Sequence, residues 1–311
     1  MAQWFTTYIN VGESALMEFI YLFGLAVMLN ALKTYLKLSK FKKDLSPFLM
    51  THMIIWIIAI IFAILHNTYV MIGWRPSEPT YNAMFYYVTC GLNLATMALP
   101  PVTVLFLSAE RCIILIFPFI ALRRIRLMLM FCHHFICCIV LGVTTWSFWV
   151  SAPTPFPLET HVLFASVLSL NGQTGNDTTT IRIVLSSANL VMAGILILAY
   201  FRSKFTKQNT TNTNRITAEL IKRTLVVQTL SDLFLNALAA IIVALTGEPA
   251  TTYLGAFNRF LVSFDSVVCA MILLKCIKKM FAETNLMNPS SVSATQMTQG
   301  MFPPGHRSGP K

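Results

Sequence analysis

The chain has 311 residues, of which 56% are hydrophobic and only 11% are charged. A soluble domain carries roughly 25% charged residues, so this composition excludes an ordinary globule surrounded by water. The formal net charge is +11, which on a soluble protein would suggest a nucleic-acid partner. The positions of the basic residues along the chain explain the net charge in another way, as described below, and we expect no nucleic-acid partner.

Seven apolar blocks follow one another along the chain. A helix needs about 20 mostly apolar residues to cross about 30 Å of hydrocarbon. The sequence predicts such helices over residues 13–36, 47–72, 83–116, 127–150, 181–201, 218–245 and 254–277. We therefore predict an all-α membrane protein whose seven-transmembrane helix bundle fills residues 13–280. Residues 1–12 form the N-terminus, and residues 281–311, which lack apolar periodicity, are predicted to be a disordered tail.

Lys and Arg in the connections predict the orientation, because short cytosolic loops carry an excess of both. All 23 lie at one side of the predicted membrane except Arg75, Arg182 and Arg259. This places the N-terminus outside the cell and the C-terminus in the cytosol. The basic side then faces anionic membrane lipids, which accounts for the net charge. Asn176, followed by Asp and Thr, is a predicted glycosylation site on the outer side.

The most specific motif is the stretch LSAERCIILIFPF at the cytosolic end of the third predicted helix. Glu110 is followed by Arg111, and Pro118 and Phe119 come eight and nine residues after the acid. This spacing resembles the E/DRY…P signature of rhodopsin-like receptors, with Cys112 in place of the usual aromatic residue. Arg keeps its charge and offers a fork of five donors, so it can exchange an internal acid for a partner protein.

Two partners for Arg111 can be read from the sequence. Glu110 is its neighbour, and Glu219 lies at the cytosolic start of the sixth predicted helix. We hypothesise that a pair between Arg111 and Glu219 breaks when the helices part, which would make a two-state switch. The alternative is that Glu110 and Arg111 only mark the membrane boundary.

Several features of most rhodopsin-like receptors are missing. The sixth helix lacks CWxP, the seventh lacks NPxxY, and the second has no Asp. No Cys lies between Cys138 and Cys269, so the usual disulfide to the loop after the fourth helix cannot form.

A short seven-helix chain that keeps the ER…PF motif resembles the nematode serpentine chemoreceptors over residues 13–280. The resemblance implies a multi-pass receptor in the plasma membrane of sensory neurons, used in olfaction or other chemosensation. Such a receptor detects an external small-molecule ligand and signals through a heterotrimeric G protein.

Polar residues inside the apolar blocks are the candidates for ligand binding, because such residues are costly in a membrane. The candidates lie in the third, sixth and seventh predicted helices: Tyr86, Thr89, Asn93, Asp232, Asn236, Arg259 and Asp265. The alternative is that these side chains only bond one another and specify how the helices pack.

The sequence shows no catalytic motif, and we expect neither an enzyme nor a cofactor. His133 and His134 do not suggest a metal site, because adjacent side chains on a helix point about 100° apart. A small transporter or a ligand-gated channel is the alternative to a receptor. A transporter would leave the ER…PF motif unexplained, and the charge distribution opposes a channel whose N-terminus lies inside the cell.

Overall fold

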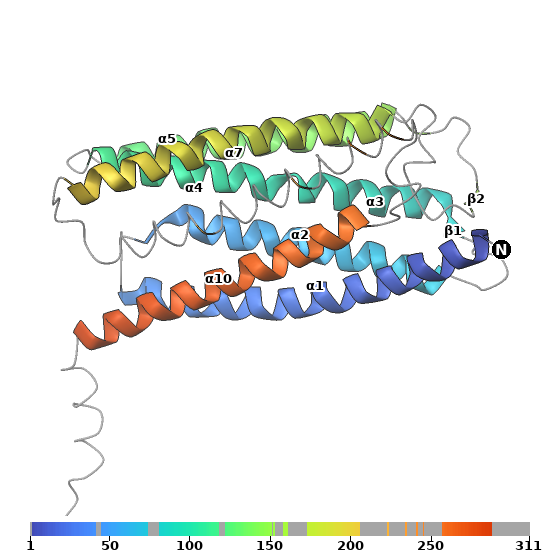
Figure 1. Cartoon of the computed structure of the whole chain (residues 1–311), viewed down its shortest axis with the longest axis horizontal. Coiled ribbons are helices and arrows are strands. Elements are labelled where there is room, and N and C mark those ends of the chain that lie inside the picture. Colours follow the sequence, from blue (N-terminus) through green and yellow to red (C-terminus); the bar gives the residue numbers. More distant parts are fainter. Residues whose placement is uncertain are drawn as a thin grey trace, which may run out of the picture.

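The computed structural model describes residues 2–41, 45–73, 81–117, 122–150, 152, 158–160, 173–205 and 257–287, and four single positions between 206 and 256. Side-chain surroundings are described for a narrower set, which leaves out residues 2–11, 40–41, 122, 160, 173–180, 182–183, 203–205, 257–261 and 283–287. The described residues are almost entirely helical, and Figure 1 shows their helices as an elongated bundle.

The helices follow the apolar blocks. They are α1 (Ala2–Phe41), α2 (Pro47–Gly73), α3 (Ala83–Met97), α4 (Leu99–Ile116), α5 (Leu122–Val150), α7 (Gln173–Phe205) and α10 (Phe257–Met287). Two short strands, β1 (Tyr81–Asn82) and β2 (Glu159–Thr160), form an antiparallel pair.

Five described segments are long and apolar enough to cross a membrane, namely Gly12–Ser39, Pro47–Gly73, Ala83–Ile116, Arg123–Val150 and Val184–Arg202. Large apolar side chains remain exposed along them, including Phe19, Phe131 and Trp149. Exposed apolar surface on every long helix is the pattern expected where lipid is the solvent. The chain is therefore a multi-pass helical membrane protein.

Two described helices extend beyond the predicted apolar blocks. Helix α1 begins at Ala2, eleven residues before the predicted first span. Helix α10 continues to Met287, ten residues past the predicted seventh span. The division into an N-terminal segment, a bundle and a tail stays a prediction. Asn176 lies within the first turns of α7, which begins eight residues before the predicted span. The predicted sixth helix lies outside the described residues, apart from four helical positions.

The described helices pack against one another in several pairs. Helix α1 packs against α2 and α10, α2 against α3 and α4, and α4 against α5 and α7. Helices α1 and α10 approach closely at Gly24, where an added Cβ would lie 3.1 Å from Val267 Cγ2. One continuous apolar core, which includes Met28, Trp56 and Leu107, joins most of these helices.

The third predicted helix is interrupted at Ala98, which separates α3 from α4. Pro100 and Pro101 come directly after the break, and neither has an N–H to donate to the preceding turn. The Ala98 N–H instead bonds the carbonyl oxygen of Ala95 at 3.3 Å, three residues back. The two prolines therefore account for the break.

Aromatic side chains and the strand pair close the end of the bundle where α2 ends and α3 begins, called here the Tyr81 end. Tyr81 is 1% exposed, and its hydroxyl donates to the carbonyl oxygen of Val70 at 3.0 Å. Burial raises the pKa of Tyr81 to about 12, and the nearby Tyr69 adds to this effect. The backbone pairing of β1 with β2 ties the loop after α5 to this end without a disulfide.

Candidate functional site

The candidate site lies at the opposite end of the bundle, called here the Glu110 end, where α4 ends and α2 and α5 begin. Glu110 and Arg111 lie in the last two turns of α4 and are 1% and 3% exposed. Charged residues are almost never fully buried unless they are paired. Their burial therefore requires partners inside the bundle.

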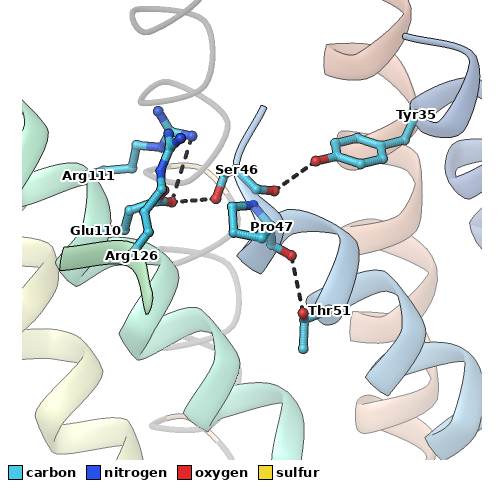
Figure 2. A network of polar contacts seen from close by, with 7 residues as sticks. All are labelled: Tyr35, Ser46, Pro47, Thr51, Glu110, Arg111 and Arg126. Carbon is cyan, nitrogen blue, oxygen red and sulfur yellow. Dashed lines mark hydrogen bonds and ion pairs between the residues drawn. The ribbon is translucent and has the colours of Figure 1, made fainter. Parts of the chain in front are cut away.

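Both carboxylate oxygens of Glu110 have partners from outside α4 (Figure 2). Arg126, near the start of α5, places its Nε 2.7 Å from Glu110 Oε1. The hydroxyl of Ser46, just before α2, donates to Glu110 Oε2. The 2.7 Å bond from Arg126 is charge-assisted, and such a bond is roughly twice as strong as one between neutral groups. Glu110 therefore connects α4 with both α2 and α5.

Ser46 is held in place from two sides. It precedes Pro47, the first residue of α2, where proline is favoured because its missing N–H has no partner to lose. The Ser46 carbonyl oxygen accepts from the Leu49 N–H at 3.1 Å and from the Tyr35 hydroxyl at 2.8 Å. Tyr35 belongs to α1, so the network extends over α1, α2, α4 and α5, as Figure 2 shows.

The distance between Arg111 and Glu110 is longer than the distance between Arg126 and Glu110. Its Nη2 lies 3.8 Å from Glu110 Oε2, which is within ion-pair range but beyond a hydrogen bond. The side chain of Arg111 is 4% exposed, against 19% for Arg126. The site thus places two guanidinium groups around one buried carboxylate.

The other predicted residues of this site lie outside the described part of the chain. Pro118 and Phe119 come just after the end of α4, and Glu219 belongs to the start of the predicted sixth helix. The hypothesis that Glu219 pairs with Arg111 therefore stays a prediction.

The predicted ligand-binding residues of α3 are buried toward the Tyr81 end. Tyr86 is 0%, Thr89 3% and Asn93 6% exposed. Thr89 Oγ1 lies 3.1 Å from His66 Nδ1, and the rings of His66 and Tyr86 have centroids 5.3 Å apart. Tyr86 and Thr89 are thus engaged with α2. The Oδ1 atom of Asn93 is buried and has no hydrogen-bond partner within the described structure.

The remaining predicted ligand-binding residues are described only in part. Asp265 is 7% exposed in α10, and the Cys269 thiol lies 3.7 Å from its Oδ1. Arg259 lies in the first turn of α10, but its side chain is outside the description, as are Asp232 and Asn236 altogether. No contact therefore tests whether these four residues share a pocket.

Sequence reasoning missed Arg126, Ser46 and Tyr35 as members of the network. One signal for Arg126 was present, because Arg126 and His133 are seven residues apart and so lie on one face of α5. His133 is buried against α4, with its Nε2 3.2 Å from Thr103 Oγ1. Among the residues that the structure describes, no three His, Cys, Asp or Glu side chains are placed to hold a metal ion.

Comparison of the chain with protein-family models and with curated proteins gives no match.

Proposed function

We propose that this protein is a G-protein-coupled chemosensory receptor with seven transmembrane helices. In this proposal the N-terminus is outside the cell and the Glu110 end faces the cytosol, in the plasma membrane of a sensory neuron. The observation that carries the proposal is the buried network in which Glu110 joins α2 and α5 while Arg111 lies beside it. An Arg buried at a helix end, within reach of an acid whose oxygens other groups already engage, suits a residue that changes partners.

The proposed mechanism is a shift between two arrangements of the helices. In the resting arrangement Arg111 stays inside the bundle, and in the active one it contacts the G protein. A ligand favours the active arrangement only by its differential affinity for the two. Moving the populations from 1:99 to 99:1 takes about 5.5 kcal/mol of such difference, which is within reach of one well-placed ligand.

The proposed ligand is a small external molecule bound within the bundle near the Tyr81 end. Asn93 supports this placement, because its buried Oδ1 leaves an acceptor that a ligand donor can satisfy. Leaving such a group unpaired costs about 1–3 kcal/mol, so a ligand that donates to it gains affinity. Glu159 and Thr160, which follow α5 in the chain, pair with β1 at this end.

The experiment compares the wild type with Arg111→Ala in a heterologous cell challenged with a panel of volatile and water-soluble odorants. An N-terminal tag, read on intact cells, matches the surface levels and reports the orientation. Arg123→Ala is the matched control, because Arg123 is an exposed arginine of α5. We expect a second-messenger response in the wild type and the control that is lost in Arg111→Ala. A response that survives the loss of Arg111, or an ionic current without a G protein, would indicate a channel or transporter instead.

A further inference from the structure

We infer that the proposed ligand is an organic amine in its ammonium form, and that Glu18 of α1 supplies the carboxylate that binds it. This inference rests on the proposed receptor function and names the chemical class of the ligand. The N-terminal end of α1 and the strand pair lie at the same end of the bundle (Figure 1). The network around Glu110 takes no part in the inferred site.

The carboxylate of Glu18 is held through one of its two oxygens. The hydroxyl of Thr68, in α2, donates to Oε1 at 2.8 Å. The other oxygen, Oε2, is buried and has no hydrogen-bond partner within the described structure. Thr68 lies two residues before Val70, whose carbonyl oxygen accepts from Tyr81, so Glu18 belongs to the Tyr81 end. The bond from Thr68 thus orients the carboxylate and leaves Oε2 for another donor.

A carboxylate inside a membrane span is costly unless a cation lies beside it, and such residues often serve as counter-ions for ligands. Glu18 lies within the span Gly12–Ser39 and next to Met17, which is 1% exposed. No cationic side chain in the described part of the chain pairs with Glu18. A ligand ammonium group would supply the opposite charge and would donate to Oε2.

An ammonium group suits these acceptors better than other ligand groups do. A hydrogen bond from a charged donor to a carboxylate is roughly twice as strong as one between neutral groups. Asn93 Oδ1 is a second buried acceptor without a partner toward the same end of the bundle. A ligand ketone or carboxylate could donate to neither oxygen, and an alcohol would bring no charge to Glu18. The ligand class that follows is therefore an amine.

The competing explanation is that an arginine of the protein neutralises Glu18. Arg75, Arg182 and Arg259 are the basic residues predicted on this side, and their side chains lie outside the described residues. Breaking a buried ion pair is strongly destabilising, whereas neutralising an unpaired carboxylate is not. Without ligand, Glu18→Gln should therefore unfold in detergent at the wild-type temperature or slightly above it. A decrease of about 3 °C or more would overturn the inference in favour of an internal pair.

Binding is measured by the rise in unfolding temperature of the purified protein, because a ligand that binds only the folded state stabilises it. The probes are hexylamine, isopentylamine and phenylethylamine, each beside the alcohol and the carboxylate of the same carbon skeleton. We expect at least one amine to stabilise the wild type, with an apparent affinity about tenfold lower in Glu18→Gln. Thr68→Val should weaken amine binding about threefold and Thr68→Ser should restore it. Glu159→Gln is the matched control, because Glu159 is an exposed acid of β2 at the same end.

A signalling assay separates this inference from the proposed function. Nucleotide exchange on purified G-protein heterotrimers is measured with the same compounds and variants in lipid vesicles. Amine binding that depends on Glu18 without any exchange would support the ammonium site and contradict the receptor function. Exchange driven by an alcohol but by no amine would support the receptor function and overturn the inference. The inference is also overturned if no amine stabilises the wild type, or if Glu18→Gln binds the amine as tightly as the wild type does.

Discussion

Replacing Gly91 with alanine is expected to destabilise the contact between α3 and α5. A Cβ built on Gly91 would lie 2.7 Å from Cδ1 and 2.9 Å from Cε1 of Phe148. Carbon atoms that are not bonded rest at about 3.5–4.0 Å, so the ring would have to retreat by about 1 Å. The substitution therefore presses one added methyl group, the Cβ of residue 91, against the ring of Phe148.

The Phe148 ring has little freedom to retreat. Phe148 is 9% exposed, its ring centroid lies 4.2 Å from that of Tyr87, and the Tyr87 hydroxyl donates to the Phe148 carbonyl oxygen. Adding a methyl group to a well-packed site costs about 1–3 kcal/mol. Replacing a glycine inside a helix by alanine returns about 0.5–1 kcal/mol. The net expectation is a loss of about 1–2 kcal/mol, or roughly 1.5–3 °C in the unfolding temperature of a 311-residue chain.

The assay is thermal unfolding in detergent, followed with a dye that reacts with buried thiols as they become exposed. Gly142→Ala and Gly194→Ala are matched controls, because nothing lies within 4 Å of a Cβ at either position. Both should be as stable as the wild type or slightly more stable. Adding Phe148→Leu to Gly91→Ala should recover part of the loss. The reasoning is refuted if Gly91→Ala unfolds at the same temperature as Gly194→Ala.

Two further predictions concern the membrane and the pH. Phe135 is 59% exposed within the span Arg123–Val150, and Phe135→Asp should cost about 3 kcal/mol of insertion if this face meets lipid. Insertion is measured by protease protection in microsomes with Phe135→Leu as the control, and unchanged insertion would contradict a lipid-facing position. The raised pKa of Tyr81 means that the folded chain keeps this proton between pH 10 and about 12 while the unfolded chain loses it, so stability falls as the pH rises through this window. Tyr81→Phe should make the decrease in unfolding temperature above pH 10 shallower, and an identical slope in both proteins would refute this attribution.

The helices could be predicted from the sequence because the membrane thickness fixes their length. The predicted second helix, 47–72, differs from α2 by one residue, and the predicted third helix ends where α4 ends. The ends of α1 and α10 could not be predicted in the same way. Their outer turns continue beyond the predicted apolar stretch, where hydropathy gives no signal.

The partners of the motif could not be predicted, because they depend on how neighbouring helices are aligned. The prediction that Glu110 and Arg111 form a site required only their spacing in one helix. The contributions of Ser46 and Arg126 required the relative positions of α2, α4 and α5, which local sequence does not contain. Thr89 illustrates the same limit, because its bond to His66 depends on α2 and α3 lying side by side.

The choice of Arg126 over its neighbours is a consequence of the rotation of α5 about its own axis. Arg123 and Arg124 are exposed, whereas Arg126 contacts Glu110. Two turns further along α5, His133 contacts Thr103, which lies seven residues before Glu110 in α4. Arg126 and His133 are seven residues apart on α5, and Thr103 and Glu110 are seven residues apart on α4. Because the two helices are antiparallel, the contact of His133 with Thr103 fixes the rotation that brings Arg126 to the Glu110 carboxylate. A shift of α5 by one residue would turn it by about 100° and place an apolar side chain against the buried Glu110. The polar contact between His133 and Thr103 thus helps to build the candidate site from two turns away.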